Sequence, residues 1–592
     1  MERGASKDGA LSKVNDRYAS VLISDRHGSY FSQGIEGNHT FYHGMACRFP
    51  IDEEWTMFKF IERIDVKNST ISKREDTIIF TSDEQEITAR FCAENTLSLE
   101  CQSGTRINIS LDPRKIYDFS RFGRHIKVYE EEGYLIAEYE KKDDEHHPYR
   151  LFLGVKGIKE HKFSDEWVPR DYGFDRERSG NGEWFVNEGL ELITDGPLKI
   201  VQHHDKRSLI KRLHEDDDII NDNTGTFDSA DNINDEDITS AYKSAVIATE
   251  ELSVKDEGLY AGYYWFFQFW TRDEAISLGG LIKEGKKDLT RTIIKRHLSS
   301  FLDDGRISNR FPHSMLGSAD GTGWSILRLE ESSSFFSEEE LGNFAKKIEY
   351  SVHLLEKNYM KDGLFRNAPK ETWMDTNGET SDVRSGFRIE IQALMMRAYS
   401  FLSELTKNES YLKKMDNLRH ATRELLFDGE ILADGAEDDM SVDKTLRPNV
   451  FLAYYIFPDM LEEEAWEKAF NSCLGALWLE WGGLATIDKS SPLFKEEYTG
   501  ENDESYHRGD SWFFVNNLAA IAMHRLDKEK YSSHIKSIIR ASTHDILHKG
   551  MIGAASEISS AKEQRAEGAW QQAWSCCTFI ELIHEAYGNG QG

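Results

Sequence analysis

Two different hydrophobic periodicities divide the sequence. Up to about residue 205, apolar and polar residues alternate at every second position in short runs, as in residues 19–24, 77–80, 97–101, 107–111 and 134–139. Successive side chains of a β-strand point to opposite faces, so this period predicts half-buried strands. Turns rich in Gly, Asp, Asn and Ser separate the runs. The N-terminal part is therefore predicted to be an antiparallel β-sandwich.

From about residue 238 the apolar positions recur with the period of an α-helix, for example at Tyr242, Ala245, Val246 and Thr249. This period predicts about twelve helices, near residues 240–252, 273–284, 287–302, 318–332, 337–357, 387–405, 409–426, 447–457, 461–475, 508–525, 528–546 and 567–587. Six antiparallel hairpins can bury their apolar stripes by closing into a ring. A helical-repeat solenoid would give the same pattern, although no repeat of fixed length is visible.

A polar and strongly acidic segment separates the two parts, and it leaves little apolar surface to bury. We therefore expect a multidomain α+β protein with a β-sandwich over residues 1–212, an acidic linker over 213–238 and an (α/α)6 toroid over 239–592. A calcium loop is the alternative for the linker. It lacks the ordered ligand spacing and the closing Glu of an EF-hand.

Composition and charge narrow the class of protein. The 592 residues exceed the size of a single core, and the apolar fraction of 39% with 43 glycines is that of a globular chain. The net charge of −32 repels nucleic acids and anionic lipid, so neither is expected as a partner. The first residues lack a secretory signal and no uncharged run could span a bilayer, which favours a cytoplasmic protein. Six cysteines without CxxC spacing indicate neither disulfides nor zinc.

The informative chemistry lies in the connections between helices. Seven aromatic residues occupy eight positions from Tyr263 to Trp270, and Arg272 and Asp273 follow them. A sugar offers flat C–H patches and a rim of hydroxyls, so a sugar site combines aromatic rings with Arg and carboxylate side chains. A structural Arg–Asp pair that caps a helix beneath a buried aromatic cluster explains the same residues. This segment alone does not separate the two interpretations.

Similar clusters recur in the later connections. Asp320 stands beside two glycines and Trp324 at a helix start, where it could also serve as a cap. His507 taken alone is more typical of a hydrogen-bonded structural histidine than of a catalytic one. The other clusters are residues 372–375, 388–394, 446–449, 506–512, 556–558 and 568–575. Their recurrence at one kind of position around the presumed ring favours a single cleft on one rim.

Read in order, these segments resemble the amylo-α-1,6-glucosidase domain of the glycogen debranching enzyme family. The motifs are WTRDEAISLGG, DGRISNRFP, SADGTGW, TWMD, IEIQAL, LRPN, YHRGDSW, SEI and GxxxQAWS, and they cover about Trp270 to Glu581. Residues 37–45 resemble the N-terminal signature of the same family more weakly. The resemblance implies an (α/α)6 toroid behind a β-sandwich. It also implies an exo-acting, inverting hydrolase of α-glucans or α-glucosides without metal or organic cofactor.

By motif match, the resemblance makes Asp320 the general acid and Glu557 the general base. Inversion needs these carboxyl groups about 6.5–9.5 Å apart, so that a water molecule fits between them and the sugar. The same match assigns Arg272 and Asp273 to the hydroxyls of the terminal sugar. The further candidates for the pocket wall and substrate binding are Trp270, Trp373, Asp375, Glu390, His507 and Trp512.

The sequence departs from the family pattern at Ser318, Gly321, the segment 395–397 and Arg508. Because of these departures, the motifs do not identify the leaving group of the reaction. The substrate can be a branch point, a linear α-glucan or a small α-glycoside. A trehalase-like hydrolase on the same toroid is the nearest alternative. A non-catalytic glycan-binding scaffold would need no carboxyl pair, and a protein-binding solenoid would not need the aromatic and acidic connections. The presence of both acids at their motif positions favours catalysis, and the oligomeric state stays open.

Overall fold

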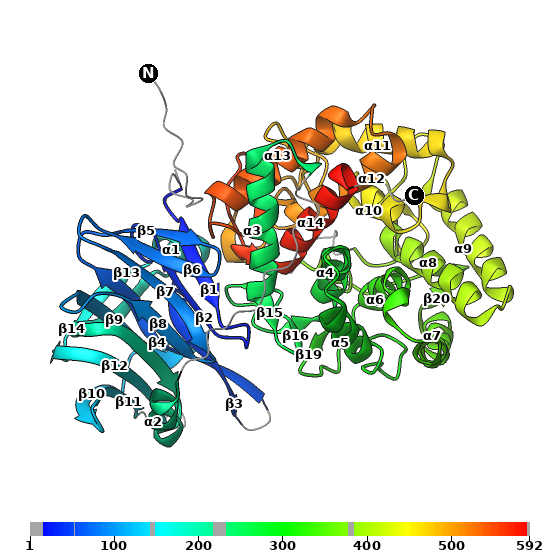
Figure 1. The fold of residues 1–592 in the computed structure, drawn as a ribbon. Helices are drawn as coiled ribbons and strands as arrows, with labels where there is room; N and C mark the ends of the chain where they lie inside the picture. The colour runs from blue at the N-terminus through cyan, green and yellow to red at the C-terminus, as the bar shows by residue number, and fades with distance from the viewer. Residues whose placement is uncertain (1–15, 52–53, 143–147, 217–231, 377–383, 589–592) are drawn as a thin grey trace. The chain divides into compact units, whose positions relative to one another are not determined.

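A computed structural model describes residues 16–51, 54–142, 148–216, 232–376 and 384–588 (Figure 1). The chain forms two compact units. Unit 1 contains Met1–Thr224 together with the short stretches Glu250–Val254 and Leu547–Gly553. Unit 2 contains Gly225–Thr249, Lys255–Ile546 and Ala554–Gly592. Most of the predicted acidic linker, residues 217–231, lies outside the described residues.

Unit 1 is a set of antiparallel strands, as its sequence period predicts. The strands are β1 (Ser20–Ser24), β2 (Tyr30–Gly34), β3 (Gly44–Ile51), β4 (Glu54–Val66), β5 (Thr70–Arg74), β6 (Thr77–Thr81), β7 (Glu86–Ala93), β8 (Thr96–Glu100), β9 (Arg106–Lys115), β10 (Arg124–Glu131), β11 (Tyr134–Lys141), β12 (Tyr149–Phe163), β13 (Trp167–Asp171) and β14 (Glu183–His203). Two short helices, α1 (Gly173–Ser179) and α2 (Lys206–His214), accompany them.

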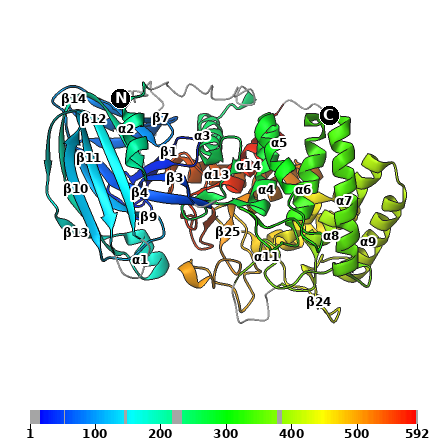
Figure 2. The same cartoon turned by 90° about the horizontal axis from the view of Figure 1, so that it is seen from below.

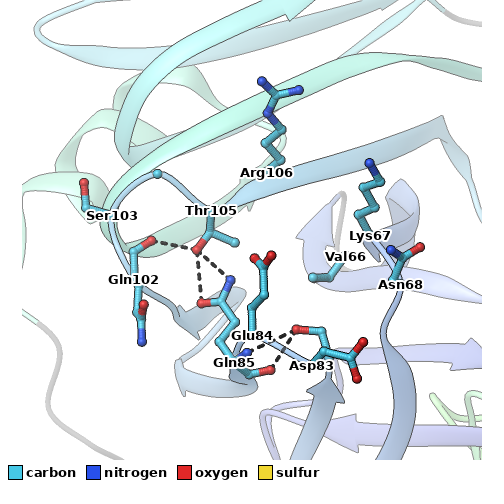
Figure 3. Close-up of a pocket in the computed structure, with 12 residues that line it drawn as sticks. Val66, Lys67, Asn68, Asp83, Glu84, Gln85, Gln102, Ser103, Thr105 and Arg106 are labelled. Carbon is cyan, nitrogen blue, oxygen red and sulfur yellow. Dashed lines mark hydrogen bonds between the residues drawn. The ribbon is translucent and has the colours of Figure 1, made fainter.

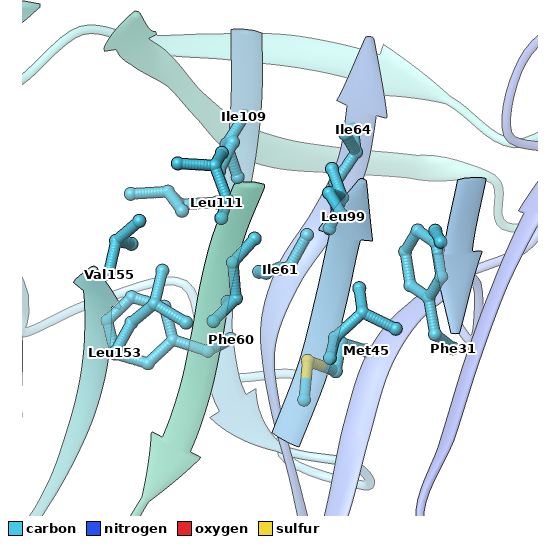
Figure 4. Close-up of a cluster of buried hydrophobic side chains, with 14 of the residues drawn as sticks. Phe31, Met45, Phe60, Ile61, Ile64, Leu99, Ile109, Leu111, Leu153 and Val155 are labelled. Carbon is cyan, nitrogen blue, oxygen red and sulfur yellow. The ribbon is translucent and has the colours of Figure 1, made fainter. Parts of the chain in front are cut away.

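The strands form two layers around one apolar core, which confirms the predicted sandwich. Strand β1 packs on β5, β6 and β7, and β12 packs on β4, although neither pairs with those strands. Alternate side chains of both layers meet between them, among them Phe31, Phe60, Leu111 and Leu153 (Figure 4). The long strand β14 pairs with four other strands, β8, β9, β12 and β13.

A buried ionic cluster holds the segment at residues 37–45 in which the sequence resembles the family signature. Asp112 is buried and accepts from Lys59 at 3.0 Å, Arg114 at 2.9 Å and Arg124 at 2.6 Å. Burial alone would raise the pKa of Asp112, but these three cations hold it well below its usual range. Arg114 and Lys59 also donate to the backbone oxygen of Phe41. The cations therefore connect this segment to the sandwich.

Three turns at one end of unit 1 surround a pocket of about 460 Å³ (Figure 3). The turns contain residues 66–68, 82–85 and 102–106. The Gln85 side chain and the Thr105 hydroxyl exchange hydrogen bonds of 3.0 and 3.2 Å within it. Polar and charged side chains make up most of the lining, and no aromatic residue is among them. The pocket therefore lacks the flat apolar surface that stacks on a sugar ring.

Unit 2 contains the helices that the 3.6-residue period predicts. They are α3 (Glu236–Leu252), α4 (Thr271–Lys283), α5 (Lys287–His297), α6 (Gly321–Glu331), α7 (Glu338–Tyr359), α8 (Ile389–Thr406), α9 (Ser410–Leu426), α10 (Asn449–Ile456), α11 (Glu463–Leu477), α12 (Phe513–Asp527), α13 (Ser532–His548) and α14 (Ala573–Tyr587). Two-residue strands connect them: β15 (Ser253–Val254), β16 (Gly258–Leu259), β17 (Gly262–Tyr263), β18 (Phe269–Trp270), β19 (Arg310–Phe311), β20 (Met360–Lys361), β21 (Leu364–Phe365), β22 (Phe387–Arg388), β23 (Gly435–Ala436), β24 (Val442–Asp443), β25 (Ser511–Trp512), β26 (Ile558–Ser559) and β27 (Gln571–Gln572).

Every second helix of unit 2 belongs to an inner ring. Helices α4, α6, α8, α10, α12 and α14 each pack on the next one, and α14 packs back on α4. The intervening helices lie outside this ring (Figures 1 and 2). The return from α14 to α4 closes the ring, so the structure is an (α/α)6 toroid. An open solenoid, the alternative left by the sequence, has no such contact.

The largest errors in the predicted helix starts are at two inner helices, α12 and α14. The prediction places helix starts at residues 508 and 567, whereas α12 begins at Phe513 and α14 at Ala573. The residues just before these helices pair as strands β25 and β27. A two-residue strand is too short to produce a period, so the sequence pattern assigns it to the helix.

No helix in the described part of the chain is both long and apolar enough to cross a membrane.

Candidate active site

The N-terminal ends of the inner helices meet at one end of the ring. Four of these helices follow a two-residue strand directly: α4 after β18, α8 after β22, α12 after β25 and α14 after β27. Strand β27 pairs with β17, which joins the last hairpin to the first. Helix N-termini carry a partial positive charge, so this end of the ring favours carboxylates.

Asp320 lies at the N-terminus of α6 and has 0% of its surface exposed. Its carboxylate makes no capping bond to α6, and the Ser318 hydroxyl accepts from the Gly321 N–H instead. The Nε of Arg272 donates to Asp320 Oδ2 at 2.7 Å. The other oxygen, Oδ1, has no hydrogen-bond partner among the described residues. Asp320 therefore presents one free oxygen, which does not fit the capping interpretation.

Arg272 joins two predicted site residues through one guanidinium group. Besides binding Asp320, its Nη1 donates to Asp375 Oδ2 at 3.3 Å, and Asp375 is the exposed partner, with 45% of its side chain accessible. Asp273, the next residue of α4, accepts from the Gln572 amide at 3.2 Å. Helix α4 thus contacts both neighbours of the ring, α6 and the start of α14.

Glu557 lies just before β26 and has 3% of its surface exposed. The Tyr506 hydroxyl donates to Glu557 Oε1 at 2.5 Å, and the Ala569 N–H donates to Oε2 at 2.9 Å. Burial and the negative charge of Glu557 raise the pKa of the Tyr506 hydroxyl well above its usual value. Tyr506 is therefore a hydrogen-bond donor to Glu557 throughout the accessible pH range.

Hydrogen bonds connect Asp273 to the segment that carries Glu557. The Gln572 amide donates to Asp273, and the Gln572 backbone N–H donates to the Ala555 carbonyl, two residues before Glu557. Burial raises the pKa of Asp273 to about 8, with the negative charges of Glu557 and Asp375 adding to it and Arg272 opposing it. The adjacent Arg272 contacts Asp320. The two predicted acids, which lie 237 positions apart in the chain, therefore come to the same end of the ring.

Three predicted aromatic residues form one buried wall. The His507 ring stacks on Trp512 with centroids 5.0 Å apart, and Trp373 meets both rings edge-on at 5.4 Å. Burial and the surrounding arginines lower the pKa of His507 well below its usual value, so this imidazole is neutral. Trp373 and Trp512 are buried, so they support the site from behind. A sugar would not stack on their faces without movement.

The aromatic run at residues 263–270 is mostly internal packing. Tyr263, Tyr264 and Phe269 are buried, and Tyr260 stacks on Phe269 with centroids 5.5 Å apart. These rings match the buried cluster that the sequence left as an alternative. Trp270 is the partly exposed residue next to α4, and its indole N–H is buried without a partner among the described residues.

Glu390 lies in a buried ionic network. Arg384 donates to both oxygens of Glu390 at 2.8 and 3.0 Å and to both oxygens of Asp434 at 2.8 and 3.1 Å. The Asn449 amide links this network to the wall, since it donates to Asp434 at 2.7 Å and accepts from the Trp373 indole at 2.7 Å. Both Glu390 oxygens are thus engaged by Arg384, a residue that the sequence motifs do not single out.

We expect Asp434→Asn to destabilise the fold by about 3–5 kcal/mol, because it leaves buried arginines uncompensated. Burial would raise the pKa of Asp434, but Arg384, Arg388 and Arg447 hold it at about 2. A carboxylate with a lowered pKa stabilises the native state above its unfolded pKa of about 4. That contribution is lost as the pH falls from about 4 through 2.

Thermal unfolding of both proteins between pH 3 and 7 measures this effect. The loss of Tm caused by the substitution should shrink as the pH falls below 4. Asp438→Asn is the matched control, since Asp438 pairs with Arg366 at the surface. An equal loss of Tm at all pH values would show that Asp434 is not held ionised by its neighbours.

Gly568 provides the space that Glu557 occupies. Its φ is +65°, and a Cβ at this position would lie 2.2 Å from Glu557 Oε2. Gly285 has nearly the same φ, +64°, with no atom within 4 Å of the corresponding Cβ. Alanine costs about 1–2 kcal/mol at either position because of the left-handed backbone. Only Gly568→Ala also displaces the carboxylate.

The motif match predicts that Glu557 is the general base. On that prediction we expect Gly568→Ala to lower kcat/KM by about 100-fold, as small displacements of catalytic groups can do. Gly285→Ala should lose comparable stability and keep its activity. Steady-state kinetics and Tm of the two variants make the comparison. Equal activity of the two alanine variants would show that the position of Glu557 does not limit the reaction.

Several buried polar atoms at this end of the ring lack partners among the described residues. Buried polar groups are nearly always hydrogen-bonded, so each such atom beside the candidate residues indicates a group that a ligand or water satisfies. They are Trp270 Nε1, Asn309 Oδ1, Asp320 Oδ1, His507 Nε2 and Gln572 Oε1. Donors and acceptors are both present, which suits the hydroxyls of a sugar.

No group of three or more His, Cys, Asp or Glu residues in the described ranges could hold a metal ion.

Tyr506 is a candidate site residue that the sequence analysis did not propose, although it lies in a segment that the analysis identified. It precedes His507 in a recognised segment, but only its contact with Glu557 gives it a role.

Residues 240–581 match the family model described as amylo-alpha-1,6-glucosidase. No curated protein matches the chain. A bacterial glucoamylase in complex with acarbose aligns with 99% of this chain and 96% of its own, with a TM-score of 0.57 and 10% identity. A GH63 mannosylglycerate hydrolase from Thermus thermophilus aligns with 58% of this chain and 99% of its own, with a TM-score of 0.43 and 12% identity. The alignment with the glucoamylase shows that both units share its fold.

Proposed function

The chain belongs to the amylo-alpha-1,6-glucosidase family, and we propose that it is an exo-acting, inverting glycoside hydrolase that releases glucose from α-glucans or α-glucosides. The observation that supports this proposal is that Asp320 and the segment of Glu557 are both hydrogen-bonded to the start of α4. Arg272 binds Asp320, and Asp273 binds the amide of Gln572, whose backbone N–H donates to Ala555, two residues before Glu557. Two carboxyl groups with different surroundings are what acid–base hydrolysis of a glycosidic bond requires.

Asp320 is the general acid. Its Oδ1 carries the proton that passes to the glycosidic oxygen as the bond from C1 to the leaving group breaks. Arg272 binds the other oxygen at 2.7 Å and so fixes the orientation of the carboxyl group.

Glu557 is the general base. The Tyr506 hydroxyl and the Ala569 N–H stabilise its ionised form and fix its orientation. A water molecule adds to C1 from the face opposite the leaving group, and the proton that this water loses goes to Glu557. The anomeric configuration is inverted, because a single displacement joins the water oxygen to C1 as the leaving group departs.

Arg272 controls access to Asp320. Asp320 has no exposed surface in this ligand-free structure, and Arg272 bridges it to the exposed Asp375. The sugar hydroxyls compete for the donors of Arg272 and draw it away from Asp320. The glycosidic oxygen then approaches Oδ1. Binding of the terminal sugar and exposure of the acid are thus coupled through one side chain.

Product analysis tests this function. Maltose, isomaltose, trehalose, starch and limit dextrin are each incubated with the protein, and thin-layer chromatography identifies what is released. Glucose from α-1,4- or α-1,6-linked substrates is the expected result, with none from the Asp320→Asn variant. Activity on trehalose alone would replace the proposal with a small α-glycoside hydrolase. Binding without hydrolysis of any substrate would replace it with a glycan-binding scaffold.

A further inference from the structure

Unit 1 carries a group of exposed aromatic rings that are not among the candidate catalytic residues. Three of them, Tyr117, Phe119 and Phe122, stand on the loop at residues 116–123 between β9 and β10, and Phe185 stands on the nearby strand β14. Their exposed fractions are 50, 42, 80 and 38%. Soluble proteins expose single apolar residues often but groups of large rings rarely, so such a group indicates a binding surface.

Ring contacts and Arg121 position three of these residues, and Phe122 follows Arg121 on the same loop. The buried Tyr42 ring contacts both Tyr117 and Phe119, with centroids 6.4 and 6.5 Å apart. The guanidinium of Arg121 lies 5.8 Å from the Phe185 ring centroid and donates to the Glu183 carbonyl at 2.9 Å. We call Tyr117, Phe119, Phe122 and Phe185 the aromatic patch.

The loop backbone is fixed from beneath by a buried lysine. Lys141 has no exposed surface, and its ammonium group donates to the Ser120 carbonyl at 3.0 Å, to the Ser120 hydroxyl at 3.1 Å and to the Phe122 carbonyl. Asp118 accepts from the Tyr149 hydroxyl at 2.8 Å and from the Ser120 N–H at 2.9 Å. The loop is therefore ordered before any ligand binds, which lowers the entropy cost of binding.

The size of the patch argues against a stable protein partner. Each aromatic side chain has a surface of about 200 Å². With the exposed fractions given above, the four side chains together expose about 400 Å². A stable protein complex buries about 800 Å² on each partner. The net charge of −32 also opposes association with nucleic acid or anionic membranes. A small, flat, uncharged ligand unit fits these limits better.

The chemistry of the patch fits a sugar chain. Beside the rings, Arg121 uses one of its five N–H donors on the Glu183 carbonyl, and guanidinium donors suit sugar hydroxyls. The exposed apolar residues at this place are all aromatic. The exposed hairpin at residues 310–316 of unit 2 differs, since it offers Met315 and Leu316 beside Phe311. Rings with polar groups at their edges match the C–H faces and hydroxyl rim of glucose units.

We propose that the aromatic patch is a non-catalytic binding surface for α-glucan chains. The choice of an α-glucan as ligand rests on the proposed function. A polymer has enough glucose units to bind the patch and an active site at once and so gains affinity from two linked contacts, whereas a disaccharide has too few units for two contacts. The patch therefore acts on polymeric substrates and leaves small ones unaffected.

The test is affinity electrophoresis of the full chain in gels that contain glycogen or amylopectin. All proteins carry Asp320→Asn, so that the polysaccharide is not digested. The double variant Tyr117→Ser/Phe122→Ser removes the two most exposed rings and should weaken polysaccharide binding by about 10-fold, a loss typical of removing one of two linked contacts. Tyr350→Ser is the matched control, because Tyr350 is 66% exposed on α7 of unit 2. It should bind as tightly as the parent.

A second measurement uses the double variant with Asp320 intact. Its kcat/KM on glycogen should fall while its kcat/KM on the best disaccharide substrate stays that of the parent. A fall on both substrates would overturn the proposal, as would equal retardation of the double variant and the parent in the gel. A change of molar mass by light scattering, with retardation unchanged, would identify the patch as a protein contact and overturn it too.

The binding assay also separates this proposal from the proposed function, because it does not need turnover. Retardation that depends on the patch, in a protein that hydrolyses none of the substrates, would support the patch and end the proposed function. Hydrolysis of α-glucans with no retardation of the parent would support the function and end the proposal for the patch.

Discussion

Replacing Asp320 with asparagine should lower kcat by about 10²–10⁴-fold, the usual contribution of a general acid. Asparagine has nearly the same shape, and its amide oxygen can still accept from Arg272, which binds Asp320 Oδ2 at 2.7 Å. What it lacks is the proton for the leaving group. KM should change little, because substrate binding depends on other side chains.

The defect should depend on the leaving group. An activated substrate such as an aryl α-glucoside or α-glucosyl fluoride needs little or no protonation, so Asp320→Asn should retain much more of its activity on it than on maltose. Asp303→Asn is the matched control, since Asp303 is exposed on the same connection. It should be fully active. Unchanged turnover of maltose by Asp320→Asn would refute the assignment of the acid.

Replacing Glu557 with glutamine should lower kcat by a similar factor of about 10²–10⁴ on every substrate, activated or not. The water must still lose a proton whichever group leaves. Glutamine keeps an oxygen that can accept from Tyr506, so the surroundings of the site should be preserved. The contrast with Asp320→Asn on activated substrates therefore separates base from acid.

Azide gives a second test of Glu557. In the Glu557→Ala variant, a small anionic nucleophile that needs no base can take the place of water. We expect azide to restore turnover of an activated α-glucoside and to give β-glucosyl azide, the inverted product. Glu563→Ala, at an exposed position nearby, is the control and should neither lose activity nor form the azide. Formation of α-glucosyl azide would mean that Glu557 is not the base of a single displacement.

The fold could be predicted well because its elements leave periodic patterns. Helix α8 is buried along most of its length and still has the 3.6-residue period that predicts it at residues 387–405. The strands of unit 1 alternate at every second residue, and those predicted at residues 107–111 and 134–139 lie within β9 and β11. The two-residue strands that precede inner helices are too short to show a hydrophobic period. Their positions could therefore not be predicted from the sequence.

Several residues that the motifs single out lie together in the structure. Arg272, Asp273, Asp320 and Asp375 are brought together, as are Trp373, His507 and Trp512. The role of a residue was not predictable where it depends on a distant partner. Both oxygens of Glu390 face Arg384, and Arg384 also binds Asp434, fifty positions further along the chain. No sequence period or motif reports such a contact.

Gly568 and Tyr506 illustrate the same limit. Gly568 is the glycine of the GxxxQAWS motif, but the motif does not say why a glycine is needed there. The reason is Glu557 Oε2, 2.2 Å from where its Cβ would stand. Tyr506 was visible in its segment, but the bond to Glu557 joins residues 51 positions apart. Motifs identify which residue types occur in a segment. The fold determines which side chains from distant segments contact the same carboxylate.

The stereochemistry of the first product formed tests the central claim most directly. ¹H NMR follows the anomeric protons while the parent protein hydrolyses an α-linked substrate at high enzyme concentration, before mutarotation mixes the anomers. If Asp320 and Glu557 act across one cleft with a water molecule between Glu557 and the sugar, β-glucose forms first and α-glucose appears only later. Initial release of α-glucose would contradict the account, because it would require a covalent intermediate in place of the single displacement.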